Sequence, residues 1–172
     1  MGDTVGERIL VIGNSGAGKS TLAHALAGVI PLPVVDLDLI HWENEGYGIK
    51  RDETTARRLV ESEAIKPRWI IEGVFAWLAE IAAPRASGLF WLDIPWSACR
   101  ANLERRGLRR GATEQDHAEL IAWAAAYWDR QTSSSYTGHS RLFERFAGFK
   151  GRLANQAEID QVLSRLAGNA RR

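Results

Sequence analysis

Cysteine is nearly absent from this chain, because Cys99 is the only one among 172 residues. A single cysteine excludes an internal disulfide and a metal site built from several thiolates. It also fits a reducing cytoplasm, where we expect the protein to reside. The chain has no run of about 18 apolar residues that would predict a membrane span, and its first residues lack the apolar core of a signal peptide.

Charge of one sign is not in excess either. The 22 Lys and Arg residues are balanced by 21 Asp and Glu residues, which leaves a formal net charge of +1. Bulk electrostatics therefore favours neither a nucleic-acid partner nor a membrane. No repeat or low-complexity tract divides the chain, and its length predicts a single domain over residues 1–172.

One stretch near the N-terminus carries a strong chemical signal. An apolar run over residues 9–12 stops at a glycine, and a helical pattern follows a short Gly- and Ser-rich segment. The P-loop pattern G-x-x-x-x-G-K-[ST] is matched by Gly13, Gly18, Lys19 and Ser20. The alternative is a Gly-rich turn that happens to precede a helix, but both flanking elements are those that a P-loop requires.

A P-loop binds the phosphates of a nucleoside triphosphate. Its glycines turn backbone N–H groups inward as an anion nest, and the helix N-terminus adds its dipole. Lys19 is expected to meet the β- and γ-phosphates, and the Ser20 hydroxyl to bind Mg²⁺. No Asp-x-x-Gly follows the P-loop and no Asn-Lys-x-Asp occurs, so we expect ATP rather than GTP, with Mg²⁺. The expected loop residues are Gly13, Asn14, Ser15, Gly16, Ala17, Gly18, Lys19, Ser20 and Thr21.

Apolar runs alternate with helical patterns along the rest of the chain. Strands are expected at 8–12, 34–36, 69–71, 89–92 and 149–153. Helices are expected at about 18–27, 52–64, 75–81, 95–107, 114–130, 140–146 and 157–166. This alternation predicts an α/β fold with a largely parallel sheet.

Acidic residues follow the expected strands at the edge where open parallel sheets bind ligands. Asp36 and Asp38 follow the second strand, and Glu72 follows the third. Carboxylates there serve a metal or activate an acceptor hydroxyl, although strand-end carboxylates also cap helices and form turns. Strand alternation places Asp36 and Asp38 on the same side, which favours a functional pair. Asp93, after the fourth strand, is better interpreted as a helix cap.

Two further clusters have both an ordinary and a functional interpretation. The basic cluster is Arg105, Arg106, Arg109 and Arg110. It is either a solvated face or a set of phosphate-neutralising arginines, with Gly107 and Gly111 as hinges of a closing lid. The aromatic residues His41 and Trp42 either line a substrate pocket or pack in a small core.

In this order, the residues resemble the nucleotide-kinase-like branch of P-loop proteins. More closely, they resemble the small adenylate-kinase-like proteins described as DNA topology modulation (FlaR-related) proteins. The matching segments are 12–21, 36–42, 69–73, 90–95 and the arginines downstream. The resemblance implies a P-loop NTPase three-layer sandwich, in which helices cover both faces of a five-stranded parallel sheet of order 2-3-1-4-5. It also implies an acceptor-side insertion over about 39–66 and a lid over about 106–114.

The resemblance also implies roles for single residues. Similarity to shikimate kinase-like enzymes assigns Asp36, with Ser20, to Mg²⁺ and Asp38 to the acceptor hydroxyl. Similarity to adenylate kinases assigns Arg106, beside Arg105, to the nucleotide phosphates. The arginine that stacks on adenine in that family is replaced here by Asn102. The expected acceptor-binding residues are Asp38, His41, Trp42 and Arg110.

The sequence therefore predicts an ATP-dependent kinase that acts on a small molecule, a nucleoside or a nucleotide. It would transfer the γ-phosphoryl group to a hydroxyl or phosphate acceptor. The expected catalytic residues are Lys19, Asp38, Glu72 and Arg106. Two alternatives remain open. One is an ATPase that works as a conformational switch, and the other is a nucleic-acid-associated regulator, supported only by the basic residues at 105–110.

Overall fold

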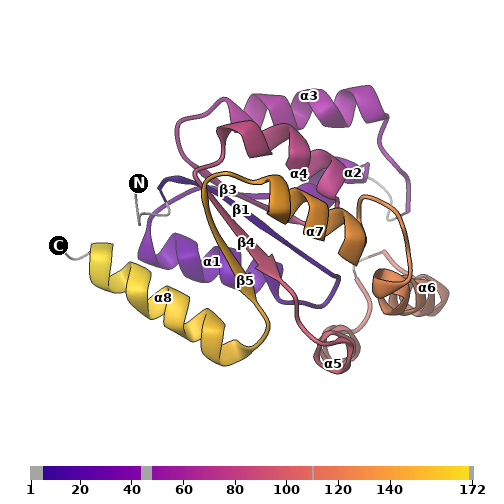
Figure 1. Cartoon of the computed structure of the whole chain (residues 1–172). Helices are drawn as coiled ribbons and strands as arrows, with labels where there is room; N and C mark the ends of the chain where they lie inside the picture. The colour runs from indigo at the N-terminus through magenta and orange to yellow at the C-terminus, as the bar shows by residue number, and fades with distance from the viewer. Residues whose placement is uncertain (1–5, 44–47, 110, 171–172) are drawn as a thin grey trace.

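The sheet has the architecture that the alternating pattern predicts. A computed structural model describes residues 6–43, 48–109 and 111–170. Their strands form one five-stranded parallel sheet of order β2-β3-β1-β4-β5 (Figure 1). The strands are β1 (Arg8–Gly13), β2 (Val34–Asp36), β3 (Trp69–Gly73), β4 (Gly88–Leu92) and β5 (Phe149–Leu153). The α/β class and the strand order are confirmed.

Helices cover both faces of this sheet. They are α1 (Lys19–Val29), α2 (Leu37–His41), α3 (Glu53–Ala64), α4 (Ala76–Ala82), α5 (Trp96–Arg106), α6 (Glu114–Ala125), α7 (Tyr136–Arg145) and α8 (Gln156–Ala170). Figure 1 shows α1 and α8 together on one side of the sheet and α3, α4 and α7 on the other. No helix in the described part of the chain has the length and apolar character needed to span a bilayer.

The central strand β1 is buried on both faces, which explains its continuous apolar sequence. Ile9 and Val11 pack in one core cluster with residues of α1 and α8. Leu10 and Ile12 pack in the other, with residues of α3, α4 and α7. Because successive side chains of a strand point to opposite faces, β1 holds the two layers together and ends at the P-loop.

The short helix α2 departs from the sequence prediction. Its N-cap is Asp36, whose side chain accepts a hydrogen bond of 2.8 Å from the backbone N–H of Asp38. Asp38 therefore lies on a helix, and the argument from strand alternation is wrong. The two carboxyl groups still lie close together, because an N-cap side chain folds back over the first turn of its helix.

Asp93 also departs from its predicted role. The N-cap of α5 is Pro95, and no side chain caps this helix. Asp93 instead forms an ion pair with Arg152 of β5, the strand beside β4. A contact between residues 59 positions apart leaves no signal in the local sequence.

A buried hydrogen-bond chain anchors α7 to the segment after β3. The Nε2 atom of His139 lies 2.9 Å from the carbonyl oxygen of Val74, and its Nδ1 lies 2.6 Å from the Tyr127 hydroxyl. Because a carbonyl only accepts, Nε2 carries the proton and Nδ1 accepts from Tyr127. The indole N–H of Trp91 donates to the same hydroxyl over 3.2 Å. The imidazole is therefore held neutral and in one tautomer.

This neutral histidine makes stability depend on pH. Burial lowers the pKa of His139 to about 3 from an ordinary 6.5. Between these values the unfolded chain binds a proton that the folded chain does not, so the folded state loses stability as pH falls below 6.5. We expect this group to lower the free energy of unfolding by about 1.4 kcal/mol for each pH unit below 6.5, and by little above it, measured by urea unfolding between pH 7.5 and 5.

The variant His139→Gln isolates this contribution, because glutamine does not titrate. It should give a smaller slope of unfolding free energy against pH than the wild type. The slope should not vanish, since burial also lowers the pKa of His41 to about 4. A variant whose slope equals that of the wild type would contradict the assignment.

Candidate active site

The P-loop is built by the end of β1 and the start of α1. Residues 14–18 join the two elements, and α1 begins at Lys19 with Gly18 as its N-cap. No side chain caps this helix, and its first turn carries no acidic residue. Its backbone N–H groups are therefore available to an anion, as the motif predicts.

Gly16 allows the loop to approach α5 closely. A Cβ atom added there would lie 2.3 Å from the carbonyl oxygen of Cys99, and its φ is +80°. Gly18 has a similar φ of +91°, but an added Cβ would meet nothing within 4 Å. Both positions have a left-handed backbone, which favours glycine. Only at Gly16 would a side chain also collide with α5.

These two glycines form a matched pair for mutagenesis. Gly18→Ala should cost about 1–2 kcal/mol of unfolding free energy, from the left-handed backbone alone. Gly16→Ala should cost about 1–3 kcal/mol more, because the extra atom overpacks the contact with α5. Urea unfolding of the ligand-free protein measures both, and equal losses would show that the close approach has no energetic weight.

Lys19 lies at the centre of a charged group. Its Nζ donates to the carbonyl oxygen of Asn14 over 2.8 Å. Burial lowers the pKa of Lys19, and the carboxylates of Glu72, Asp38 and Asp36 oppose this shift. The lysine is thus held beside the P-loop backbone by one hydrogen bond and three nearby negative charges.

The carboxylates expected at the strand ends lie together. Asp36 of β2 pairs in register with Glu72 of β3, and Glu72 Oε1 accepts a hydrogen bond of 2.5 Å from the Ser20 hydroxyl. Burial raises the pKa of both Asp36 and Glu72 above ordinary carboxyl values. Glu72, which is only 2% exposed, therefore lies beside Ser20, the residue predicted to bind metal.

This oxygen set fits Mg²⁺ as a partner of bound phosphates. Among the described residues, no group of three or more His, Cys, Asp or Glu side chains forms a complete metal site. Mg²⁺ rarely needs one, because it binds through one or two protein oxygens, waters and substrate phosphates. Burial raises the pKa of Glu72, and a cation beside Ser20 and Glu72 would lower it again by favouring the ionised carboxylate.

The basic cluster divides between α5 and the loop after it. Arg105 and Arg106 form the last turn of α5. Beyond Gly107, Arg109 reaches across to Asp38, and its NH1 atom lies 2.7 Å from Asp38 Oδ2. Arg110 lies outside the described residues. The predicted base is therefore paired with an arginine of the predicted lid.

His41 and Trp42 lie in an aromatic cluster. The His41 ring stacks on Phe75 with centroids 3.7 Å apart, and the Trp42 ring meets it edge-on at 4.5 Å. The P-loop and the carboxylates line a cavity, and neither His41 nor Trp42 is among the described residues that line it. His41 is buried. This arrangement fits the packing interpretation, and contact with an acceptor stays a prediction.

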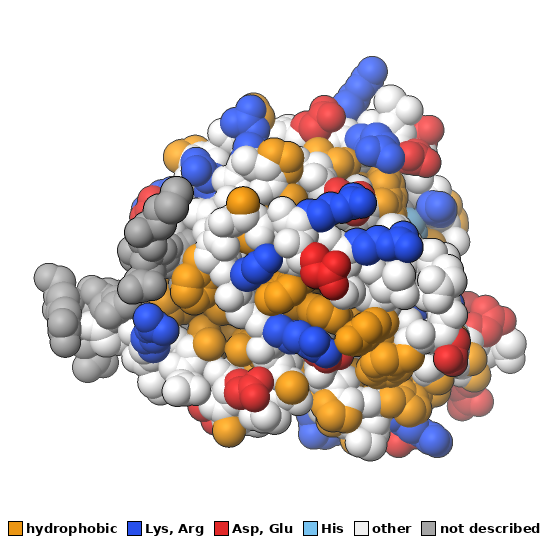
Figure 2. Space-filling view, in the orientation of Figure 1, with side chains coloured by type: hydrophobic (Ala, Val, Ile, Leu, Met, Phe, Trp, Pro, Cys, Tyr) orange, Lys and Arg blue, Asp and Glu red, His pale blue; other side chains and the backbone are white. Residues whose placement is uncertain are grey.

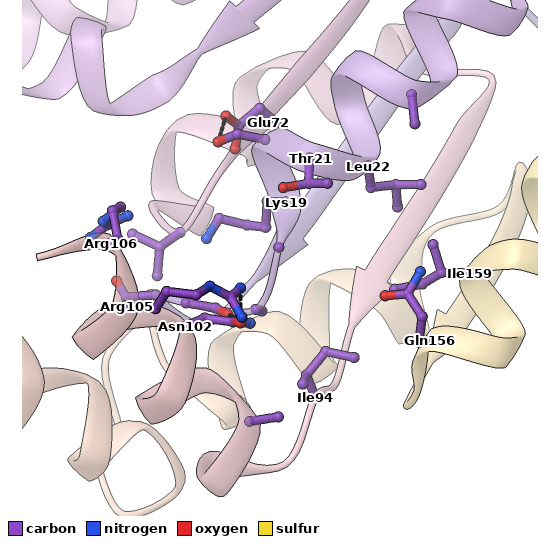
Figure 3. A pocket seen from close by; sticks show the side chains of 18 of the residues that line it. Lys19, Thr21, Leu22, Glu72, Ile94, Asn102, Arg105, Arg106, Gln156 and Ile159 are labelled. Carbon is purple, nitrogen blue, oxygen red and sulfur yellow. Dashed lines mark hydrogen bonds between the residues drawn. The ribbon is translucent and has the colours of Figure 1, made fainter.

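A cavity of about 830 Å³ joins the P-loop, the carboxylates and the arginines. Its lining includes Asp36, Asp38, Glu72 and Arg109, together with the P-loop, Lys19 and Ser20. The lining also includes Thr21, Leu22, Ile94, Pro95, Ala98, Gln156, Ile159 and Leu163. Figure 3 shows Gln156 and Ile159 of α8 at the right, across the cavity from Arg105 and Arg106. Sequence reasoning missed most of these residues, because they come from α1, α5, α8 and the segment between β4 and α5, and resemble ordinary core residues.

Comparison of the sequence with protein-family models and with curated proteins gives no match. Solved structures match the fold over nearly the whole chain. A sugar kinase from Janibacter sp. HTCC2649 has a TM-score of 0.56 at 18% sequence identity, covering 96% of this chain and 92% of its own. A gluconokinase from Sinorhizobium meliloti 1021 has a TM-score of 0.57 at 17% identity, covering 96% and 95%.

A third similar structure contains a bound small molecule. It is a shikimate kinase from Acinetobacter baumannii in complex with shikimate, with a TM-score of 0.57 at 16% identity, covering 95% of this chain and 94% of that one. At such identities the likeness shows the fold alone, which this chain shares with a sugar kinase, a gluconokinase and a shikimate kinase. The chemistry has to be argued from the residues of the cavity.

Proposed function

We propose that this protein is a kinase that binds ATP with Mg²⁺ and transfers the γ-phosphoryl group to a hydroxyl or phosphate group of a small molecule. One observation carries the proposal. A single cavity joins a P-loop with an uncapped helix N-terminus to the carboxylate of Asp38, and arginines border it. Phosphoryl transfer needs little beyond such positioning and electrostatic stabilisation.

Each group has a defined task in this proposal. The backbone N–H groups of the P-loop and of the first turn of α1 bind phosphate oxygens, and Lys19 neutralises their charge. Ser20 would hold Mg²⁺, together with Asp36 and Glu72, and the bound ion neutralises charge on the β- and γ-phosphates. Arg106 and its neighbour Arg105 contribute positive charge from the last turn of α5.

Asp38 is the proposed base for the acceptor hydroxyl. Its carboxylate lies at the acceptor end of the cavity, where Arg109 now holds one of its oxygens. An acceptor hydroxyl would take the place of this contact, and the segment at about 106–114 would move as a lid about Gly107 and Gly111. Both glycines have a positive φ, of 68° and 81°. The acceptor-side insertion at about 39–66 stays part of this proposal, although none of its described residues lines the cavity.

The acceptor class follows from the chemistry of this end. Asp38 suits a hydroxyl group, and the structures with this fold include a sugar kinase, a gluconokinase and a shikimate kinase bound to shikimate. Small hydroxylated metabolites are therefore the first class to test, followed by nucleosides and nucleoside monophosphates. We also propose the resemblance to FlaR-related proteins, which does not identify an acceptor.

A nucleic-acid partner has little support. On the face shown in Figure 2, Lys and Arg side chains are interspersed with Asp and Glu rather than gathered into one basic field. This pattern agrees with the net charge of +1 and lacks the clustered basic surface typical of nucleic-acid binding.

The proposal is tested by ATP consumption with Mg²⁺, alone and with each acceptor class. Stimulation by one class, with a phosphorylated product found by mass spectrometry, is the expected result. ATP hydrolysis that no acceptor changes would instead favour a switch ATPase. Absence of any ATP binding, measured by calorimetry, would contradict the proposal as a whole.

A further inference from the structure

The side chain of Asn102 links the P-loop to an arginine. Its Nδ2 donates to the carbonyl oxygen of Gly16 over 2.8 Å, and its Oδ1 accepts a hydrogen bond of 2.8 Å from Nη2 of the Arg105 guanidinium. A carbonyl only accepts and a guanidinium only donates, so the amide has one possible orientation. Both ends of Asn102 are thus used. Figure 3 shows the Arg105 side chain running along Asn102.

The base of this link is rigid. Gly16 packs against α5 so closely that an added Cβ would lie 2.3 Å from the Cys99 carbonyl and 2.9 Å from the side chain of Leu103. Leu103 and Cys99 are fully buried. The P-loop and α5 therefore form one packed unit, and Asn102 extends from its surface into the cavity.

Arg105 gains a fixed direction from this contact. An exposed arginine samples many rotamers, and holding it in one costs up to about 2 kcal/mol of side-chain entropy. The hydrogen bond to Asn102 restricts the guanidinium to the side of α5 that faces the P-loop, and both residues line the cavity. Arg109 differs, because it lies beyond Gly107 and contacts the acceptor carboxylate Asp38.

We propose that Asn102 is a positioning residue, which holds Arg105 above the P-loop so that its guanidinium meets the outer phosphates of the bound nucleoside triphosphate. The inference builds on the proposed function and goes further, because it distinguishes the arginines of the cluster. Arg105 is pre-oriented toward the nucleotide phosphates before any loop moves, whereas Arg109 belongs to the acceptor end. Asn102 acts only through Arg105.

Binding of the non-hydrolysable analogue AMP-PNP with Mg²⁺, measured by calorimetry without an acceptor, tests this role. Arg105→Ala should weaken AMP-PNP binding about 10-fold, through loss of a charge-assisted contact, and should change AMP binding much less. Asn102→Ala should weaken AMP-PNP binding about 5-fold, because Arg105 remains but is no longer oriented. The double variant should bind like Arg105→Ala alone, since the two changes remove one shared interaction.

The controls separate positioning from folding. Arg100→Ala removes an exposed arginine of the same helix, whose NE atom lies 2.8 Å from Glu104, and should leave AMP-PNP affinity unchanged. Urea unfolding of each ligand-free variant reports structural damage. If Asn102→Ala does not fold, Arg105→Ala still tests the proposal, because Arg105 is exposed and its loss should not prevent folding. Unchanged AMP-PNP affinity in Arg105→Ala would overturn the proposal.

Two results would overturn the inference. One is that the losses of AMP-PNP affinity in Asn102→Ala and Arg105→Ala multiply in the double variant. Asn102 would then only hold the P-loop in place, independently of Arg105. The other is an equal loss of AMP and AMP-PNP affinity in Arg105→Ala, which would place the guanidinium away from the outer phosphates. Failure of the wild type to bind AMP-PNP would be a different outcome, because it contradicts the proposed function itself.

Discussion

Lys19→Ala is expected to lower ATP turnover by about 10²- to 10³-fold or more, the usual cost of removing one preorganised electrostatic contact to a reacting phosphate or carbonyl oxygen. The effect should be large because Lys19 faces three carboxylates as well as the P-loop backbone. Without its ammonium group, Glu72, Asp38 and Asp36 would repel an incoming triphosphate. Affinity for ATP, measured by calorimetry, should therefore fall together with kcat.

A matched lysine controls for the general effect of lost charge. Lys66 is half exposed and pairs with Glu63, with an Nζ to Oε2 distance of 2.7 Å. Lys66→Ala should leave both turnover and ATP affinity as in the wild type. If Lys19→Ala also left them intact, the assignment of the phosphate site would be wrong.

Asp38→Asn is expected to lower phosphoryl transfer by about 10²- to 10⁴-fold, the range that a positioned general base contributes. Asparagine keeps the shape of the side chain but cannot take a proton from an acceptor hydroxyl. Asp38 is the proposed base for the acceptor and takes no part in holding the phosphates, so ATP affinity should change little. The loss should therefore be found in kcat with the acceptor saturating, and not in ATP binding.

The control for Asp38 is an aspartate that asparagine can replace in its structural task. Asp52 caps α3 by accepting a hydrogen bond of 2.9 Å from the N–H of Thr55, and asparagine is an equally good N-cap. Asp52→Asn should leave transfer unchanged. Transfer at the wild-type rate in Asp38→Asn would reduce Asp38 to a structural partner of Arg109.

Local patterns in the sequence determined most elements of this fold and the P-loop motif. The apolar run of β1, the glycines after it and Lys19 are neighbours in the chain, so their spacing alone specifies a strand, a loop and a helix. The alternation of strands and helices then leads to a parallel sheet, because parallel strands need crossover helices. The sheet order came from the resemblance, and the structure confirms it.

The arrangement of the carboxylates could be predicted only in part. Asp38 and Glu72 were expected near the site because strand ends meet at one edge of the sheet. The helical conformation of Asp38 was missed, since a single turn of helix after a three-residue strand has too few residues to form a periodic pattern. Helix capping was only the alternative for Asp36, which does cap α2. Asp93 was instead interpreted as a cap, which it does not form.

Only the tertiary structure decided how the arginines are used. Arg109 reaches Asp38 across 71 positions of sequence, and Asn102 reaches Gly16 across 86. Such contacts depend on how α5 packs against the P-loop and on where the loop after it turns. Composition and spacing identify a cluster of positive charge, but packing alone links Arg105 to the P-loop through Asn102 and places Arg109 on Asp38.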